Sequence, residues 1–324
     1  MKCTNKIFVG LFVLALTLTA SGCGKENIEL ANRYNIWNTA YQTRQMDTSN
    51  SFFAEGLCVG GLENSGTDKT DSQVAEGAGV FHTETGEITY AQNIYEKLYP
   101  ASTTKILTAY LALKEGNLDD VVTVSENAVK LDSDSSNCGL LAGDKMTLRD
   151  LLYGLMMRSG NDAANAIAEH LSGDTDAFAV KMNETARMLG ATNSHFVNPH
   201  GLPDEDHYTS VYDLYLLFNA AIKDDTFCSL IHTTSYTVNY THADGSDATQ
   251  EWSSTNRYFS GEAQAPENFT VVGGKTGTTG DAGFCLVLLT ENPSGEPIIS
   301  IVLKADGRSN LYLLMNQILS GYGN

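Results

Sequence analysis

Apolar and polar positions follow two different spacings along this chain, and the places where the spacing changes outline its fold. Residues 79–82 and 87–90 flank a Thr-Glu-Thr-Gly turn, which predicts a β-hairpin. Between about residues 117 and 231 apolar residues recur at helical spacing, and from residue 269 the chain returns to short apolar runs separated by Gly and Pro. The pattern predicts an α+β fold: a mostly antiparallel sheet covered by helices, with an all-helical lobe inserted at about 117–231.

The same pattern predicts the individual elements. A helix is expected over 106–113, between Pro100 and Gly116. Thr147 and Asp174 are suitable N-caps for two further helices. The helices expected in the lobe cover residues 148–157, 161–171, 174–189 and 209–222. The remaining elements are strands at 234–241, 269–275, 284–290 and 298–303, a loop at 242–248 and a closing helix at about 310–319.

The first residues carry the features of an export signal. Two lysines precede an apolar run over residues 7–18, which is too short to span a bilayer comfortably, and small residues follow it. The small residues directly before Cys23 resemble a bacterial lipobox, although Ala20 stands where the commonest pattern has leucine. We therefore expect residues 1–22 to be a signal peptide that is removed, and a lipid on the sulfur of Cys23.

A lipid on Cys23 would hold the protein at the outer face of the bacterial cytoplasmic membrane, and ordinary secretion is the alternative. Residues 23–72 are polar and irregular, and we expect them to form a tether between the lipid and the folded domain. The domain is expected to span residues 73–322. No other stretch is long and apolar enough to be a transmembrane helix, so the lipid would be the membrane anchor.

Composition narrows the classes of function. The formal net charge of −19 opposes binding to nucleic acid or to anionic lipid headgroups. Apart from Cys3 and Cys23 the chain has four cysteines, none in C-x-x-C spacing, so the sequence favours neither a disulfide scaffold nor a zinc or redox site. We expect no metal and no cofactor. Cys285 lies in an apolar run and is expected to be a buried small hydrophobe.

Three short motifs supply reactive side chains. Ser102-Thr-Thr-Lys105 places a hydroxyl and an amine three residues apart, and Lys105 is the only lysine with a serine at this spacing. Lys275-Thr-Gly277 also occurs once. Ser-x-Asn occurs four times, and Ser159-Gly-Asn161 is the copy at the junction of two predicted helices. Together they supply the groups needed to attack an amide carbonyl without a metal or a histidine.

The chemistry of the first motif depends on an uncharged amine. Residues three apart on a helix share a face, so Ser102 Oγ and Lys105 Nζ can come within hydrogen-bond reach. A serine hydroxyl becomes a nucleophile when a base takes its proton. A lysine can be that base only if burial or a second cation lowers its pKa, and Lys275 is the expected second cation.

The second motif lies where two predicted helices meet. Gly160 would allow a sharp turn there, so that its neighbours project into a cleft between lobe and sheet. Ser159 could relay protons between the two lysines, and Asn161 could bind a substrate amide. The alternative role for Asn161 is simple capping of the second helix.

The third motif ends an apolar strand. An exposed strand edge can pair with an extended peptide through main-chain hydrogen bonds, and Gly277 would let that peptide approach closely. The Thr276 hydroxyl and the Lys275 charge are suited to a terminal carboxylate. The backbone N–H groups of Ser102 and Thr278 are candidate donors to the oxyanion of an acyl-transfer reaction.

Over residues 75–322 the chain resembles the serine D-Ala-D-Ala carboxypeptidases, which are low-molecular-weight penicillin-binding proteins. The resemblance covers the three motifs, the residues that flank them and a fourth stretch, Asn198-Pro-His-Gly-Leu-Pro203. It implies that the penultimate D-alanine of a peptidoglycan stem peptide acylates Ser102, that terminal D-alanine leaves, and that water hydrolyses the acyl-enzyme. β-Lactams would acylate the same serine and be released slowly.

The resemblance also implies a role for each motif residue. Lys105 would be the general base, and Arg308 is similar in position to a family arginine near the substrate carboxylate. Thr278 departs from the family, which often carries a larger side chain there, so an altered substrate preference is expected. The implied catalytic residues are Ser102, Lys105 and Ser159, and the implied substrate-binding residues are Asn161, Lys275, Thr276, Gly277, Thr278 and Arg308.

Three other functions are compared with this one. A class A β-lactamase shares the first and third motifs but needs a Glu-x-x-Leu-Asn stretch, which is absent between Asn161 and Lys275, and its second motif is usually Ser-Asp-Asn. A zinc peptidase would use segment 195–207, whose ligand candidates are His195, His200, Asp204, Asp206 and His207, but no His-x-x-x-His spacing is present. A non-hydrolytic, lipid-anchored binder of cell wall or β-lactam would not need the nucleophile and two lysines.

Overall fold

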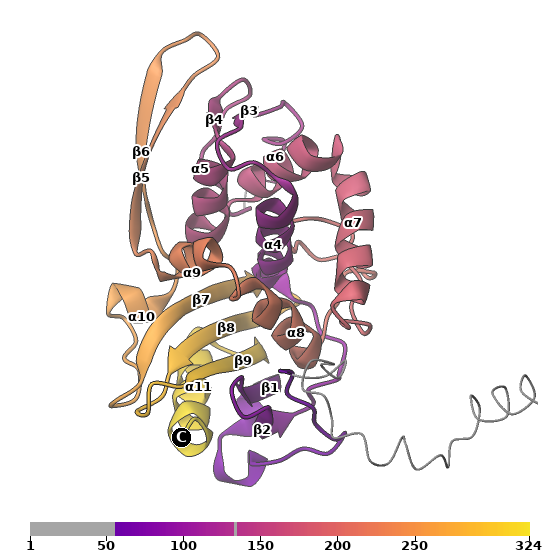
Figure 1. Cartoon of the computed structure of the whole chain (residues 1–324), viewed down its shortest axis with the longest axis vertical. Helices are drawn as coiled ribbons and strands as arrows, with labels where there is room; N and C mark the ends of the chain where they lie inside the picture. The colour runs from indigo at the N-terminus through magenta and orange to yellow at the C-terminus, as the bar shows by residue number, and fades with distance from the viewer. Residues whose placement is uncertain (1–55, 133–134) are drawn as a thin grey trace, which may run out of the picture. The chain divides into compact units, whose positions relative to one another are not determined.

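The computed structural model describes residues 56–132 and 135–324. The expected signal peptide, Cys23 and most of the expected tether lie outside the described residues. The described chain contains an antiparallel five-stranded sheet of order β2-β1-β9-β8-β7 and an antiparallel four-stranded sheet of order β3-β4-β5-β6. Figure 1 shows α11 on one side of the larger sheet and the helical lobe on the other.

The elements have the following bounds. The larger sheet contains β1 (Ala75–His82), β2 (Glu87–Gln92), β7 (Thr270–Thr279), β8 (Gly283–Glu291) and β9 (Pro297–Ala305). The smaller sheet contains β3 (Val121–Thr123), β4 (Lys145–Thr147), β5 (Ser235–Thr241) and β6 (Asp247–Ser253). The α-helices are α4 (Lys105–Glu115), α5 (Leu148–Tyr153), α6 (Asn161–Ser172), α7 (Thr175–Met188), α8 (Val211–Ala221), α9 (Asp225–His232), α10 (Arg257–Ser260) and α11 (Arg308–Tyr322). The short turns are η1 (Thr67–Lys69), η2 (Ser72–Val74) and η3 (Ala101–Thr104), which are 3-10 helical, and η4 (Gly154–Arg158), which is π-helical.

The hydrophobic core lies on both faces of the larger sheet. In β8, Leu286 and Leu288 pack with α11, whereas Val287 and Leu289 belong to the core shared with the lobe. Burial on both faces explains why this strand is apolar at consecutive positions instead of alternating. Helix α11 contacts β9, β1 and β8, and α8 contacts β9 and β1. The sheet is therefore a rigid support on which the lobe is built.

The predicted α+β fold is confirmed. The hairpin of β1 and β2, the strands β8 and β9 and the helices α4, α6, α7, α8 and α11 lie within a few residues of their expected places. Thr147 caps α5 in a reciprocal capping box with Asp150, and the Asp174 carboxylate caps α7 by accepting from the N–H of Ala177. Local capping chemistry thus fixes where these helices begin.

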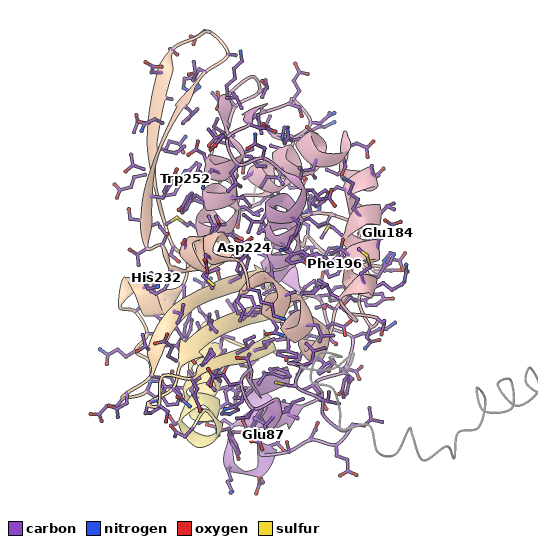
Figure 2. The ribbon with its side chains drawn as sticks, in the orientation of Figure 1. Glu87, Glu184, Phe196, Asp224, His232 and Trp252 are labelled. Carbon is purple, nitrogen blue, oxygen red and sulfur yellow. The ribbon has the colours of Figure 1, made fainter. Side chains whose placement is uncertain are left out.

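Several elements differ from the prediction. The lobe is not wholly helical, because it contains β3 and β4, and α9 was not predicted. The expected loop at 242–248 is shorter, since Asp247 begins strand β6. Most residues of β6 are polar, so its sequence shows little alternation of apolar and polar positions. The buried Trp252 is its one large apolar residue (Figure 2). The helix expected over 148–157 is α-helical to Tyr153 and then becomes the π-helical turn η4.

Residues 56–74, which include the end of the expected tether, contact the domain. Cys58 is fully buried, its N–H donates to Tyr215 Oη (2.8 Å) and its carbonyl accepts from Tyr212 Oη (2.8 Å). The four cysteines within the described ranges are free, and Cys285 is fully buried in β8 as expected. Among the helices of these ranges, none has the length and apolar content that crossing a membrane requires.

Gly201, in the loop between α7 and α8, marks a close contact of two backbone segments. Its φ is +92°, and a Cβ built there would overlap the carbonyl oxygen of Ala101, next to Ser102. Since backbone atoms must move to relieve this overlap, we expect Gly201→Ala to lower the free energy of unfolding by roughly 3 kcal/mol.

The matched control for this prediction is Gly173→Ala. Gly173 has a φ of +89°, but nothing lies within 4 Å of its built Cβ, so only the backbone strain of about 1 kcal/mol applies. Urea denaturation measures both variants. Equal losses of stability would contradict a special role for the contact with Ala101.

Candidate active site

Ser102 is held at the start of helix α4 by a tight turn. Pro100 precedes η3, Thr103 N–H donates to the carbonyl oxygen of Pro100 (3.2 Å), and Ala101 takes a left-handed φ of 47°. Lys105 is the first residue of α4. Its Nζ lies 3.1 Å from Ser102 Oγ, so the hydroxyl and amine that the spacing predicted are in hydrogen-bond contact.

The amine of Lys105 has three partners. Besides Ser102 Oγ, Nζ lies 2.8 Å from Asn161 Oδ1 and 2.7 Å from the carbonyl oxygen of His200. The two carbonyl oxygens can only accept, so they take two N–H bonds. An ammonium group would donate a third bond to Ser102, whereas a neutral amine would turn its lone pair toward the Ser102 hydroxyl. The geometry therefore suits a base that removes the proton of Ser102.

Burial favours the neutral form of this amine. Lys105 is fully buried, and desolvation first, then the charge of Lys275, hold the pKa of Lys105 well below its usual value. Lys275 is also fully buried, and desolvation lowers its pKa to about 7. Lys275 Nζ lies 3.0 Å from Ser159 Oγ and 2.8 Å from the carbonyl oxygen of Thr276. Both causes expected from the sequence thus act on Lys105.

Ser159 carries the strained backbone at the second motif. Its φ and ψ are 60° and 32°, in the left-handed region, at the end of the π-helical turn η4. Gly160 was expected to make this turn, but its φ of −62° is accessible to any residue. A Cβ on Gly160 would instead overlap Cys138 Sγ, so glycine is needed for close packing. The strain at Ser159 aims its hydroxyl at Lys275.

Asn161 is in the site and is not the N-cap of its helix. Gly160 occupies the N-cap position of α6, and no side chain caps this helix. Asn161 is buried and its Oδ1 accepts from Lys105. Among the two roles that the sequence left open, capping is therefore excluded by the geometry.

The third motif lies within β7 and not at its end. The strand continues from Lys275 to Thr279, because Thr278 and Thr279 pair with Phe284 and Gly283 of β8. β7 is an edge strand of the larger sheet, so within the described chain its second edge has no partner strand. A further extended chain could pair with that edge through its main chain.

Gly277 serves a contact that the sequence did not reveal. A Cβ there would lie 3.0 Å from Ser102 N, 3.1 Å from Ala101 Cβ and 3.1 Å from the carbonyl oxygen of Pro100. The glycine thus lets η3 pack directly on β7. This contact places Ser102 beside the Lys-Thr-Gly strand.

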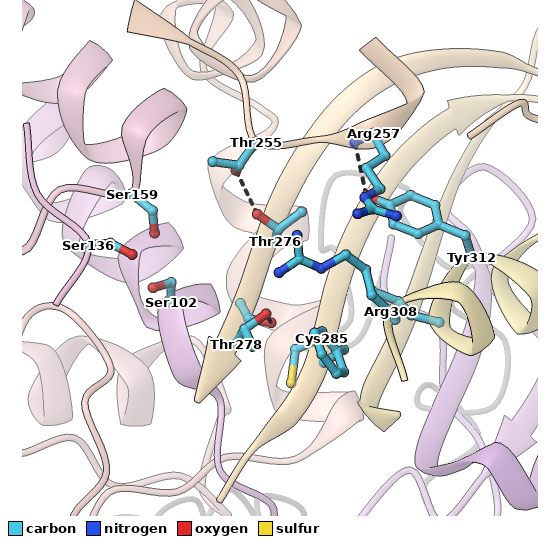
Figure 3. A pocket seen from close by; sticks show the side chains of 13 residues that line it. Ser102, Ser136, Ser159, Thr255, Arg257, Thr276, Thr278, Cys285, Arg308 and Tyr312 are labelled. Atoms are coloured by element: carbon cyan, nitrogen blue, oxygen red, sulfur yellow. Dashed lines mark hydrogen bonds between the residues drawn. The ribbon is translucent and has the colours of Figure 1, made fainter. Parts of the chain in front are cut away.

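Two cavities meet at Ser102. The first has a volume of about 170 Å³ and is lined by Ser159, Thr276 and Arg308 among others (Figure 3). The second, of about 470 Å³, is lined by residues that include Asn161, Leu202 and Gly280. Three residues line both cavities: Ser102, Ser136 and Thr278.

Arg308 enters the first cavity from the start of α11. Its guanidinium lies 5.4 Å from the centre of the Phe284 ring and extends toward Thr276 (Figure 3). The structure therefore brings all the residues predicted from the sequence to one site: Ser102, Lys105, Ser159, Asn161, Lys275, Thr276, Gly277, Thr278 and Arg308.

Sequence reasoning missed three residues of the site. Thr255 Oγ1 lies 2.7 Å from Thr276 Oγ1, and Arg257 is paired with Glu262 (3.2 Å) beside the same cavity. Both follow β6, whose strand character was hidden. Ser136 is the middle residue of another Ser-x-Asn copy, at residues 135–137. That copy could have indicated this segment, but it was interpreted as a loop away from the site.

The histidines of segment 195–207 have structural partners. His207 Nδ1 accepts from the N–H of Val197 (3.2 Å), so its Nε2 carries the proton and donates to Thr104 Oγ1 (2.9 Å). Burial lowers the pKa of His200 to about 3 and that of His207 to about 4. Within residues 56–132 and 135–324, no three His, Cys, Asp or Glu side chains converge on a possible metal position. The segment acts as a support under η3.

A family model described as D-alanyl-D-alanine carboxypeptidase matches residues 64–307. D-alanyl-D-alanine carboxypeptidase DacF of Bacillus subtilis is 36% identical over 222 residues, which are 65% of this chain and 53% of that protein. D-alanyl-D-alanine carboxypeptidase of Streptomyces sp. K15 is 33% identical over 71% of this chain and 80% of its own length. The chain thus spans about half the length of the Bacillus protein.

Solved structures show the same similarity. The crystal structure of the Streptomyces K15 DD-transpeptidase superposes with a TM-score of 0.70 at 31% identity, over 76% of this chain and 96% of that chain. The likeness therefore extends over nearly the whole of that chain.

The pKa of Lys105 provides a direct test of the site. Because the charge of Lys275 lowers this pKa, Lys275→Met is expected to raise it, and Lys105 would then need a higher pH to become neutral. NMR titration of ¹³Cε-labelled lysine measures the shift. Lys304→Met is the control, since Lys304 of β9 pairs with Glu76 of β1 (2.8 Å) and should leave the Lys105 titration unchanged. An unchanged or lower Lys105 pKa in Lys275→Met would refute the coupling.

Proposed function

We propose that this protein hydrolyses the terminal D-Ala-D-Ala bond of peptidoglycan stem peptides through an acyl-enzyme on Ser102. The chain belongs to the family of D-alanyl-D-alanine carboxypeptidases, and this membership supports the proposal. The observation that carries the proposal is the contact of 3.1 Å between Ser102 Oγ and the buried amine of Lys105. Its two other hydrogen bonds leave a neutral amine one free lone pair, which faces the hydroxyl.

Acylation begins with a proton transfer. Lys105 Nζ takes the proton of Ser102 Oγ, and the oxygen attacks the carbonyl carbon of the penultimate D-alanine. The backbone N–H groups of Ser102 and Thr278 stabilise the oxyanion, since both residues border the two cavities. Collapse of the intermediate breaks the C–N bond, and the leaving amine receives a proton from the relay formed by the two lysines and Ser159.

The two cavities divide the substrate at the scissile bond. Thr276 and Arg308 line the first cavity, where the terminal carboxylate binds, and Lys275 next to them contributes its charge when protonated. The acyl part lies along the open edge of β7 and in the second cavity, which Asn161 lines. Water then hydrolyses the Ser102 ester and regenerates the hydroxyl.

The alternatives fit the site less well. No glutamate lines either cavity of the described chain, and the carboxylate that lines the second one, Asp132, is not part of the Glu-x-x-Leu-Asn stretch of a class A β-lactamase. A non-hydrolytic binder would not need a buried amine beside a serine. Because neither cavity has such a glutamate to hydrolyse the acyl-enzyme, we infer that β-lactams are released slowly and act as inhibitors of this enzyme.

The mass of the protein after exposure to penicillin tests whether Ser102 is the nucleophile. Wild-type protein exposed to penicillin is expected to gain one penicillin mass, mapped to the peptide that contains Ser102. Ser102→Ala should lose this adduct and lose D-alanine release from a stem-peptide analogue by about a thousandfold or more. Ser229→Ala, on the exposed side of α9, is the control with normal labelling. Labelling of Ser102→Ala by a fluorescent penicillin would show that another residue is the nucleophile.

We also propose that the mature protein is a lipoprotein. Residues 1–22 are removed as a signal peptide, Cys23 carries the lipid, and residues 23–72 connect it to the domain at 73–322 on the outer face of the cytoplasmic membrane. The charged, apolar and small-residue order before Cys23 supports this proposal. Residues 24–55 could reach at most about 110 Å if fully extended, which would let the site work at a distance from the membrane surface.

Lipidation is tested at Cys23. Metabolic labelling with an alkyne fatty acid is expected to mark the wild-type protein and to keep it in the membrane fraction. Cys23→Ser should abolish the label and release the protein, because no sulfur remains for the lipid. Cys228→Ser is the matched cysteine control. Label retained in Cys23→Ser, or a mature N-terminus elsewhere, would exclude this anchor.

A further inference from the structure

Asp162 is a buried carboxylate next to the active site that the mechanism does not use. Asp162 is 1% exposed, and within the described chain its carboxylate has no ion-pair partner. Burying a carboxylate is costly unless hydrogen bonds compensate for the lost water. Both of its oxygens lie 2.9 Å from Cys138 N, and Oδ2 also accepts from Leu140 N (3.1 Å). Oδ1 accepts from Ala163 N (2.8 Å) in its own helix.

These bonds fasten the loop at 135–140 to the first turn of α6. A further bond runs from Asn161 N–H to the carbonyl oxygen of Ser136 (2.8 Å). Gly160 packs against Cys138 in the same contact, since a side chain there would overlap the sulfur. The helical turn that supplies Asn161 to the site therefore also sets the position of the loop.

The loop presents Ser136 to the reacting centre. Ser136 is exposed and lines both cavities, as do only Ser102 and Thr278 among their lining residues. Figure 3 shows its side chain on the wall opposite β7, directed toward Ser102 and Ser159. An extended peptide paired with β7 would pass between Thr278 on one side and Ser136 on the other.

We propose that Ser136 is a further substrate-binding residue and that Asp162 is the positioning residue that holds it in place. The Ser136 hydroxyl hydrogen-bonds the main-chain amide of the stem peptide that precedes the scissile bond. The carboxylate of Asp162 acts on Ser136 through the loop, by fixing the backbone at Cys138 and Leu140, and its charge also acts on Lys105, whose pKa it raises slightly against the larger effect of burial. This inference rests on the proposed function, because it assigns a contact to the substrate of the same site.

A double-mutant cycle tests both roles. Ser136→Ala is expected to lower kcat/KM for stem-peptide hydrolysis roughly tenfold, mainly through a higher KM. Asp162→Asn should give a similar loss with the same division between KM and kcat. In the double variant the losses should not add, because Asp162 acts through Ser136. Asp174→Asn is the matched control, since Asp174 caps the neighbouring helix α7 through Ala177 N (2.7 Å) away from the cavities.

Amide hydrogen exchange supplies an independent readout. Residues 136–140 should exchange faster in Asp162→Asn and not in Asp174→Asn. If Asp162→Asn does not fold, Gly160→Ala replaces it in the cycle, because a methyl group there would overlap both Cys138 Sγ and Asp162 Oδ1 and so separate the loop from the carboxylate.

The possible outcomes separate the inference from the proposed function. Penicillin acylation of the wild-type protein is measured first, and its absence would refute the proposed function itself. Normal acylation with an unchanged kcat/KM in Ser136→Ala would refute the contact of Ser136 with substrate. Additive losses in the double variant would refute the positioning role of Asp162. A non-additive cycle with the same rise in KM supports both.

Discussion

The site depends on keeping two lysine amines out of water. A buried ammonium group is unfavourable, and the structure meets this cost by surrounding Lys105 with acceptors that a neutral amine can also satisfy. Asn161 and the His200 carbonyl take its two N–H bonds and so turn the remaining lone pair toward Ser102. Lys275 adds a second nearby amine that makes a charge on Lys105 still less favourable. The proposed nucleophile, base and relay all depend on this one desolvated arrangement.

The fold creates that arrangement by bringing distant segments into close backbone contact. Three glycines mark the contacts: Gly201 against Ala101, Gly277 against Ser102, and Gly160 against Cys138. At Gly201 and Gly160 a methyl group would overlap the facing segment, and at Gly277 it would fit only if its neighbours shifted slightly. The lobe, the turn that carries Ser102 and β7 are thereby in direct contact with one another, and α11, which begins at Arg308, packs on β9, β1 and β8 of the same sheet.

Much of the fold and most of the site residues could be predicted from the sequence. Apolar spacing located the strands β8 and β9 and the helices α6 and α7, because their burial is one-sided or complete over many residues. The spacing of Ser102 and Lys105 predicted their contact, since a single helical turn sets it. The strand β6 escaped prediction because its outward face is polar, and with it Thr255 and Arg257 were missed. The reason assigned to Gly160 differs from the one observed, and the contact of Gly277 with η3 was not foreseen, since both depend on tertiary neighbours that one sequence does not display.

The unpaired edge of β7 has a consequence for what can reach the nucleophile. The strand contacts η3 and α9, and within the described chain no further strand pairs with its second edge. An extended backbone can pair with such an edge through its main chain, whereas a compact folded surface offers no free run of N–H and C=O groups for this pairing. The unpaired edge therefore favours ligands that are extended chains.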